Sequence, residues 1–243
     1  MSEILKTYFF ISDIHLGLES QEKEKQKEQS LVAFINYAKE NSDALFIIGD
    51  LFDYWFEYKK VIQKNFIRTL GALANYTDSG KEIHYIIGNH DFLHKDFFEK
   101  EIGAKVYPDF ISTELNSKKF FMAHGDGLIK NDLGYKILKK ILRNKILQKI
   151  YSYLHPDFGI SIASKSSKAS RNYTATKNYG ETDGLFETAK LKIDEGYNYV
   201  IFGHSHQKAM ENYKEGFYIN LGTWLEKPCY GKFTNKFEII DWE

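Results

Sequence analysis

Five short polar clusters recur along the chain, each placed where a β-rich apolar run ends. In chain order they read SDIHLG, GDLFDYW, GNHDF, HGDG and GHSH, at residues 12–17, 49–55, 88–92, 124–127 and 203–206. Ligands of open α/β sheets gather outside the carboxyl ends of the strands, so these clusters are predicted to meet. Glycines within the clusters allow tight turns that aim the side chains. The pattern therefore predicts an α/β fold with one shared polar site.

The apolar runs are predicted strands, and helix-like stretches separate several of them. The strands are expected at Tyr8–Ser12, Ala44–Ile48, Ile83–Ile87, Lys119–Ala123, Tyr199–Phe202, Phe217–Leu221 and Phe237–Asp241. Helices are expected at about 22–40, 60–78 and 183–195. This alternation favours an α/β sandwich. Unbroken apolar runs such as LFII and YVIF suit strands that are buried on both faces.

Length and composition favour one large domain over residues 1–243. The chain has three prolines and one cysteine, and its only low-complexity stretch is a Lys/Glu/Gln run at 21–29. A single cysteine excludes an intrachain disulfide, which suits a reducing compartment. The first residues lack a basic region followed by a long apolar stretch, and no run reaches the roughly 18 apolar residues of a membrane span. We expect a location in the cytoplasm or peripheral to a membrane.

The net charge is zero but unevenly distributed. Residues 130–177 contain eleven Lys or Arg and two acids, Asp132 and Asp157, whereas the whole chain has 33 basic and 33 acidic residues. Such asymmetry predicts an anionic partner for this region alone. Aromatic and basic residues do not interleave beyond chance, so we expect no nucleic-acid partner.

Seven side chains of the clusters are candidate metal ligands. They offer oxygen or imidazole nitrogen and no thiolate, which suits Mn²⁺, Fe²⁺ or Zn²⁺; they are Asp13, His15, Asp50, Asn89, His124, His204 and His206. If the backbone stays extended, alternate side chains of the D-x-H and H-x-H pairs reach the same side and can serve two metals. One cluster alone is more simply explained by a capping Asp or a structural His. Five in this order favour a metal site.

In this order the clusters resemble the D-x-H, G-D, G-N-H-D, H-G-D and G-H-x-H motifs of the calcineurin-like metallophosphoesterases, from Asp13 to His206. The resemblance implies a four-layer sandwich, in which two β-sheets pack face to face with helices outside. It also implies two divalent metal ions, most of all Mn²⁺, that share one bridging carboxylate. The first ion would be held by Asp13, His15, Asp50 and His206, and the second by Asp50, Asn89, His124 and His204.

The chemistry that such a centre implies is hydrolysis of a phosphoester. Two cations about 3.5–4 Å apart lower the pKa of a bridging water and neutralise phosphoryl oxygens, so that the resulting hydroxide attacks phosphorus in line with the leaving group. We expect His90 to stabilise charge or to protonate the leaving oxygen. Asp91 is interpreted either as the residue that orients His90 or as the N-cap of a helix before FLHKDFF.

The segment after HGDG predicts a helical cap at 130–178. Its first part, NDLGYKILKKILRNKILQKIYSYLHP, has the pattern of an amphipathic basic helix or helix pair. An ordinary helix packed on the core, with its basic face in solvent, is the alternative. The stretch SKSSKASRNYTATK at 164–177 suits phosphate binding or a solvated loop.

The cap, together with GDLFDYW, GNHDFL and HGD, resembles the UDP-2,3-diacylglucosamine pyrophosphatases of lipid A biosynthesis. This resemblance implies hydrolysis of a nucleotide-linked glycolipid to UMP and 2,3-diacylglucosamine 1-phosphate (lipid X). It further implies contact with anionic lipid at the inner face of the bacterial inner membrane. The implied substrate contacts are Asn89, His90, Asp132, Tyr135, Ser164, Lys168 and Arg171. The better-known members have Arg in place of His90 and Asn in place of Lys168.

Two other classes of protein share part of this pattern. One is a dinuclear-metal phosphatase or phosphodiesterase of a soluble nucleotide or phosphoprotein, in which the basic helix is only structural. The other is a non-catalytic scaffold of the same fold. A scaffold is expected to lack one or more metal ligands, whereas the full set is present here.

Overall fold

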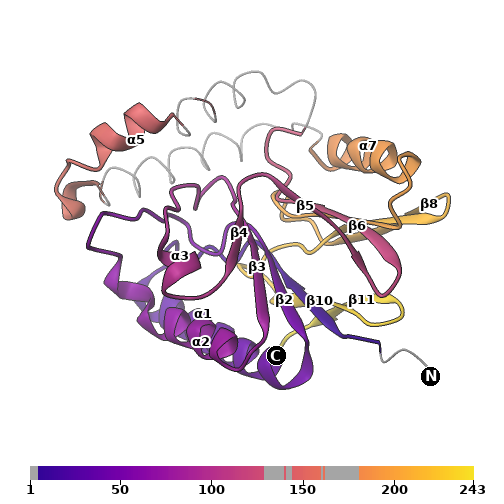
Figure 1. The fold of residues 1–243 in the computed structure, drawn as a ribbon, viewed down its shortest axis with the longest axis horizontal. Coiled ribbons are helices and arrows are strands. Elements are labelled where there is room, and N and C mark those ends of the chain that lie inside the picture. Colours follow the sequence, from indigo (N-terminus) through magenta and orange to yellow (C-terminus); the bar gives the residue numbers. More distant parts are fainter. Residues whose placement is uncertain (1–4, 129–139, 141–143, 160, 162–180) are drawn as a thin grey trace.

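Two β-sheets form the centre of the protein, which is described by a computed structural model over residues 5–128, 140, 144–159, 161 and 181–243 (Figure 1). The first sheet has six strands in the order β11-β10-β1-β2-β3-β4, and the second has five in the order β5-β6-β7-β9-β8. Strands β1 to β4 run parallel to one another, β10 runs antiparallel to β1, and β11 runs antiparallel to β10. In the second sheet, β6, β7 and β9 are parallel, and β5 and β8 are antiparallel edge strands.

The elements have the following bounds. The first sheet contains β1 (Tyr8–Ile11), β2 (Ala44–Ile48), β3 (Glu82–Ile86), β4 (Lys105–Tyr107), β10 (Cys229–Phe233) and β11 (Phe237–Asp241). The second contains β5 (Phe110–Leu115), β6 (Lys118–Ala123), β7 (Tyr199–Phe202), β8 (Ala209–Tyr213) and β9 (Gly216–Asn220). The helices are α1 (Gln21–Asn41), the short 3₁₀ turn η1 (Lys64–Phe66), α2 (Ile67–Asp78), α3 (Phe97–Lys100), α5 (Lys145–Tyr151) and α7 (Glu181–Asp194).

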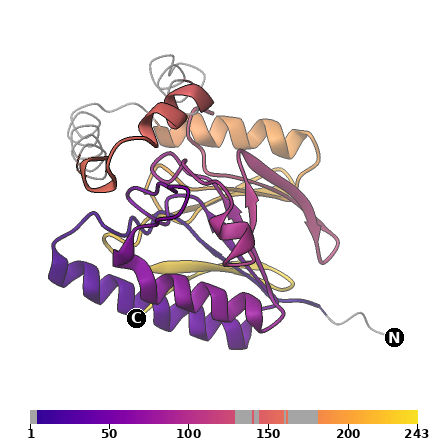
Figure 2. The same ribbon diagram turned by 60° about the vertical axis from the view of Figure 1, so that its left-hand side comes forward.

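Helices cover the outer faces of both sheets, which gives four layers from α1 and α2 at the bottom of Figure 2 to α7 at the top. Side chains alternate between the layers, as the pleat of a strand requires. Phe9 of β1 packs in the cluster between the first sheet and helices α1 and α2, whereas its neighbour Phe10 packs between the sheets. Val200 of β7 packs with Leu185 and Ala189 of α7. The expected α/β sandwich of two sheets with outer helices is confirmed.

The seven predicted strands are all present, with ends that differ by at most one residue. β2 and β7 are buried along their whole length, as their unbroken apolar runs predicted. Four further strands, β4, β5, β8 and β10, were not predicted. Three of them, β4, β5 and β8, are edge strands, and β8 buries none of its side chains, so these lack the apolar signal of a central strand. The fourth, β10, lies between β11 and β1, and its sequence CYGKF is not a continuous apolar run.

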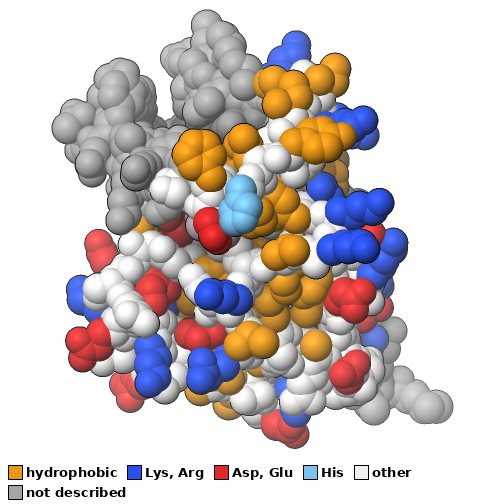
Figure 3. Space-filling model, turned by 90° about the vertical axis from the view of Figure 1, so that its left-hand side faces the viewer, with side chains coloured by type: hydrophobic (Ala, Val, Ile, Leu, Met, Phe, Trp, Pro, Cys, Tyr) orange, Lys and Arg blue, Asp and Glu red, His pale blue; other side chains and the backbone are white. Residues whose placement is uncertain are grey.

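Helix α5 lies at one end of the molecule and exposes apolar side chains to solvent. Asn144 caps the helix, because its side chain accepts the N–H groups of Ile146 and Leu147 at 2.9 and 3.2 Å. Ile146 and Ile150 are 71% and 60% exposed. Figure 3 looks onto this end of the molecule and shows hydrophobic side chains with Lys and Arg beside them in its upper part. Within the described ranges, no helix is long and apolar enough to cross a bilayer.

Candidate metal centre

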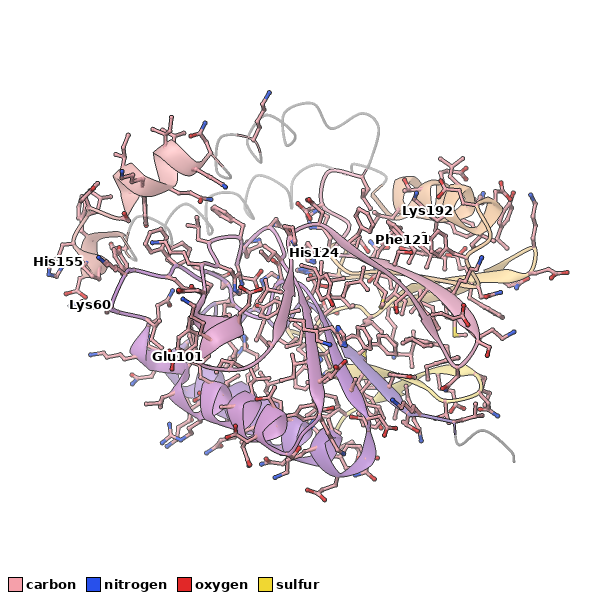
Figure 4. All side chains as sticks on the ribbon, viewed as in Figure 1. Lys60, Glu101, Phe121, His124, His155 and Lys192 are labelled. Carbon is pink, nitrogen blue, oxygen red and sulfur yellow. The ribbon has the colours of Figure 1, made fainter. Side chains whose placement is uncertain are left out.

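The loops that follow β1, β2, β3, β6 and β7 meet at one end of the sandwich, where His124 lies between the sheets (Figure 4). The first three strands are parallel neighbours in the first sheet, and the last two are parallel neighbours in the second. Their carboxyl ends therefore face the same side. This arrangement brings all five polar clusters of the sequence together.

The first group of ligand atoms surrounds His15. Its Nε2 atom lies 3.0 Å from His206 Nε2 and 3.7 Å from Asp13 Oδ1. It also lies 3.7 Å from Asp50 Oδ2, and His206 Nε2 lies 3.4 Å from Asp13 Oδ1. Neighbouring ligand atoms around an ion with bonds of about 2.1 Å are roughly 3 Å apart or more. The ligand atoms of Asp13, His15 and His206 all lie within 4.8 Å of one another, so these three fit around one metal ion, and Asp50 lies beside them.

The second group surrounds His124. Its Nε2 atom lies 2.8 Å from Asn89 Oδ1 and 3.2 Å from Asp50 Oδ2. Its other nitrogen, Nδ1, lies 2.9 Å from the carbonyl oxygen of Ile48, which orients the ring. The ring of His204 lies edge-on to that of His124, with centroids 5.2 Å apart. Asp50 Oδ2 thus faces both groups, in the position of a bridging ligand.

The electrostatics of the site favour cations. Asp13, His15, Asp50 and His124 are almost completely buried. Burial alone would lower the pKa of His15, but the carboxylates of Asp13 and Asp53 outweigh it and raise the pKa to about 9. Burial would likewise raise the pKa of Asp50, yet the neighbouring imidazoles, with His124 foremost, hold it well below its usual range. Carboxylates that stay ionised in a buried site attract positive charge, whether from a proton on histidine or from a metal ion.

Five of the candidate ligands have a left-handed backbone, so the D-x-H and H-x-H pairs do not have the extended backbone that their predicted pairing assumed. Eight non-glycine residues of the described chain have positive φ angles, and five of these residues, with φ from 50° to 68°, are Asp13, His15, Asp50, His204 and His206. This region disfavours residues with a Cβ atom, and such strain persists only where the surrounding structure enforces it. The other three lie in the β5–β6 and β8–β9 hairpin turns. Strain in this protein therefore concentrates where the ligand atoms gather.

Two glycines of the motifs are required by close packing. A Cβ atom on Gly88 would overlap the Asp50 carboxylate, and one on Gly203 would overlap the side chains of Ser12 and Asp13. The G-N-H and G-H-x-H motifs thus begin with glycine because a carboxylate of the site occupies the space of a side chain.

His90 lies beside the two groups and contacts Asp53. Its backbone N–H donates to Asp50 Oδ1 at 2.8 Å, which ties the loop after β3 to the carboxylate between the two groups. The Nδ1 atom of its ring lies 3.1 Å from the carbonyl oxygen of Asp53 and 3.5 Å from its Oδ1. Asp53 Oδ1 also lies 3.7 Å from His15 Nδ1. Asp53 was not predicted as a site residue, although its place as the second acid of G-D-x-x-D was a usable signal.

Asp91 has partners other than the His90 ring. Its Oδ1 accepts the N–H of Gly88 at 2.8 Å, and its Oδ2 accepts the N–H of Leu51 at 2.9 Å and the hydroxyl of Tyr85. The N-cap of the helix that follows, α3, is Asp96. Asp91 therefore joins the loops after β2 and β3, which is neither of the two roles considered for it from the sequence.

The end of β9 and the loop after it hold two of the other turns in place. Asn220 donates from Nδ2 to the carbonyl oxygen of Gly203 at 2.7 Å and to Ser205 Oγ at 3.0 Å. Thr223 Oγ1 donates to the carbonyl oxygen of Asp13 at 2.9 Å. These residues were not predicted either. The sequence NLGT at 220–223 has the same pattern of polar residues after a strand as the five clusters.

The sequence matches the calcineurin-like phosphoesterase family over residues 6–208. This chain belongs to the calcineurin-like phosphoesterases. A UDP-2,3-diacylglucosamine hydrolase of Porphyromonas gingivalis is 32% identical to this phosphoesterase over 242 residues, covering 91% of this chain and 92% of that protein. One from Haemophilus influenzae is 31% identical, covering 90% and 91%. The structure of an archaeal phosphodiesterase has a similar fold, with a TM-score of 0.50, 16% identity and coverage of 97% and 99%.

The comparisons confirm the family and fold that the motifs implied. Calcineurin-like phosphoesterases bind a dinuclear metal centre, and this phosphoesterase brings together candidate ligands for one. Most of the predicted cap at 130–178 lies outside the described residues. The same holds for five predicted substrate contacts, Asp132, Tyr135, Ser164, Lys168 and Arg171.

Proposed function

We propose that this phosphoesterase hydrolyses the pyrophosphate of UDP-2,3-diacylglucosamine to UMP and 2,3-diacylglucosamine 1-phosphate. The observation that carries the chemistry is the position of Asp50 Oδ2, which lies 3.2 Å from His124 Nε2 and 3.7 Å from His15 Nε2. One carboxylate oxygen between two groups of ligand atoms is the arrangement that a two-metal phosphoesterase needs. The substrate is supported by relatives of that name, which match the chain over about nine tenths of its length.

The residues proposed to hold the two metal ions come from all five polar clusters. The first ion would be held by Asp13, His15, Asp50 and His206, and the second by Asp50, Asn89, His124 and His204. Oxygen and imidazole ligands without thiolate suit Mn²⁺, with Fe²⁺ and Zn²⁺ as alternatives. When bound, the two ions supply an activated water and neutralise charge on the phosphoryl oxygens.

His90 is proposed to act on the substrate beside the two ions. The contacts of its Nδ1 atom with Asp53 fix the orientation of the ring, so Nε2 is the nitrogen that would approach the phosphoryl group or the leaving oxygen. A positioned imidazole can stabilise the developing negative charge or donate a proton to the leaving group. Asn89, whose Oδ1 faces His124, would contact the same phosphoryl group through its amide.

The cap is proposed to hold the acyl chains and to bring the enzyme to anionic lipid at the inner face of the inner membrane. The exposed Ile146 and Ile150 lie on the same helix as Lys145 and Lys149. Apolar side chains flanked by lysines suit the boundary between acyl chains and anionic headgroups. Asp132, Tyr135, Ser164, Lys168 and Arg171 are proposed to contact the substrate from this segment.

A product assay tests the proposed function. Purified protein with Mn²⁺ is expected to release UMP and 2,3-diacylglucosamine 1-phosphate from UDP-2,3-diacylglucosamine in detergent micelles, as measured by mass spectrometry. EDTA should abolish the release, and Asp50→Asn should reduce it by orders of magnitude, because one carboxylate serves both ions. Hydrolysis of a soluble phosphodiester without any turnover of the lipid would assign the chain to soluble phosphodiesterases instead.

A further inference from the structure

The charged run at the start of α1 is only partly a solvated helix face. Its sequence, QEKEKQKE, predicts full exposure, and Lys23 is indeed 70% exposed. Lys27, one turn further along, is only 6% exposed. Lysine is almost never buried to this extent without partners, so the contacts of this ammonium group define its role.

Lys27 and Glu24 together hold the loop that follows β1. Lys27 Nζ donates to the carbonyl oxygen of His15 at 2.8 Å and lies 2.8 Å from Glu24 Oε1. Glu24 in turn accepts the N–H of Gly17 at 2.7 Å through Oε2 and the N–H of Glu19 at 2.8 Å through Oε1. Two side chains of α1 thus bind three backbone groups of this loop.

His15 needs such support because its backbone is left-handed. Its φ angle is 50°, in the region that disfavours a residue with a Cβ atom. Its N–H donates to the carbonyl oxygen of Asp50 at 3.0 Å, and its carbonyl oxygen accepts from Lys27. Both polar backbone groups are therefore fixed, and the Nε2 atom of the ring is held 3.0 Å from His206 Nε2.

Neutral groups hold the carbonyl oxygens of two other turns of the site, whereas the N–H of His204 donates to the charged Asp13 carboxylate. The carbonyl oxygen of Asp13 accepts from Thr223 Oγ1 and the Trp224 N–H, and that of Gly203 accepts from Asn220. Lys27 differs from these neutral groups because its hydrogen bond is charge-assisted and therefore stronger. Since Glu24 balances the ammonium charge, the pair adds little net positive charge beside a site that binds cations.

We propose that Lys27, supported by Glu24, is a positioning residue that holds His15 in the conformation that binds the first metal ion. The inference rests on the proposed metal centre. Changes to groups that orient metal ligands typically weaken metal binding roughly 10- to 100-fold. Lys27→Met is therefore expected to weaken the binding of one of the two metal ions by that factor and to leave the affinity for the other ion unchanged.

The experiment is a titration of wild-type protein and Lys27→Met with Mn²⁺. Calorimetry measures the two affinities, and electron paramagnetic resonance spectra are recorded at each Mn²⁺ concentration. Wild-type protein is expected to show the exchange-coupled spectrum of two neighbouring Mn²⁺ ions. Lys27→Met at limiting Mn²⁺ is expected to show the six-line spectrum of an isolated ion, and to recover the coupled spectrum and near wild-type kcat at high Mn²⁺. Lys27→Arg, which keeps the charge and the donors, should behave like wild-type protein.

Lys23→Met is the matched control, because Lys23 lies on the same helix, is 70% exposed and lies 3.7 Å from Glu19, which is also 3.6 Å from Lys27. If Lys27→Met fails to fold, Glu24→Gln removes the charge pair while keeping one acceptor. This variant is expected to weaken the binding of the same metal ion. If Lys27→Met binds both ions as tightly as the wild-type protein does, the positioning role is overturned. The same holds if the variant loses affinity for both ions to the same extent. A wild-type protein that binds fewer than two ions would overturn the proposed metal centre itself.

Discussion

The ring of His90 lies against Asp53, with Nδ1 3.1 Å from the carbonyl oxygen and 3.5 Å from Oδ1. Since the same carboxylate lies 3.7 Å from His15 Nδ1, one acid touches both a candidate metal ligand and the proposed catalytic histidine. A carboxylate in this position orients imidazole rings and stabilises their charged forms.

Asp53→Asn is therefore expected to lower kcat by roughly 10- to 100-fold. The amide keeps the size of the side chain but removes the negative charge beside both rings. The measurement is steady-state hydrolysis of a soluble phosphodiester at saturating Mn²⁺, with metal content determined in parallel. A kcat equal to that of the wild-type protein would contradict the role of Asp53 in orienting His15 and His90.

Asp91→Asn is the matched comparison, because Asp91 accepts hydrogen bonds from Gly88, Leu51 and Tyr85. An amide nitrogen placed among these donors leaves buried groups unpaired, which costs about 1–3 kcal/mol. Urea denaturation of metal-free protein should show that loss for Asp91→Asn. Unchanged stability of Asp91→Asn would contradict the role of Asp91 in joining the loops after β2 and β3.

The metal-free protein is expected to lose stability as the pH rises from about 6.5 to 9. The carboxylates around His15 outweigh burial and raise the pKa of this residue to about 9, and that of His124 is also raised. The native state therefore keeps protons that the unfolded state releases above pH 6.5, so stability is full below that pH and is lost as the pH passes the native pKa. His15 alone accounts for up to about 3 kcal/mol.

Urea denaturation in EDTA at pH 6.5 and pH 9 measures this loss. His15→Asn should show a smaller difference between the two pH values, because the group that holds the proton is gone. Mn²⁺ competes with the same proton, so its affinity should rise over this interval. Stability that stays constant or increases from pH 6.5 to 9 in EDTA would contradict the charge arrangement described for the site.

The sequence carried most of the fold and the candidate ligands because both depend on local patterns. The strands β2 and β7 are continuous apolar runs, and Asp50 and His204 follow them after a single glycine. The edge strand β8 was missed because it buries none of its side chains. Local periodicity reveals a strand only when one face of it is buried, so it carries no information about an exposed strand that is held by backbone pairing with β9.

Lys27 and Asn220 were missed for a different reason. Each acts through a hydrogen bond to the backbone of a residue far from it or in another element: Lys27 to His15, and Asn220 to Gly203. Such contacts depend on how the helices and loops pack, and a run such as QEKEKQKE reads as a solvated helix whichever of its lysines is buried. The roles of Asp53 and Asp91 likewise depended on the direction in which each carboxylate points.

Gly88→Ala is expected to abolish activity together with metal binding. The added methyl group would occupy the space of the Asp50 carboxylate, so the proposed bridging ligand would have to move. Gly71→Ala is the matched control, since a Cβ atom there meets nothing within 4 Å, in helix α2. That variant should keep full activity and gain about 0.5–1 kcal/mol of stability, because alanine favours a helix. Full metal content in Gly88→Ala would contradict the close packing of Asp50 on this glycine.

Replacing Ile146 and Ile150 by Ser is expected to reduce hydrolysis of the diacylated substrate but not that of a soluble phosphodiester. Both side chains are largely exposed, at 71% and 60%, so the change removes little packing and should leave the melting temperature within about a degree or two. Contact with acyl chains contributes about 0.8 kcal/mol for each buried methylene. Turnover of the lipid in mixed micelles is therefore expected to fall at least about tenfold. Ile67→Ser, at a position on α2 that is 69% exposed, is the control and should change neither activity. Equal losses on the lipid and the soluble diester would mean that α5 supports the metal centre rather than the acyl chains, and the proposed lipid contact would then lose its structural basis.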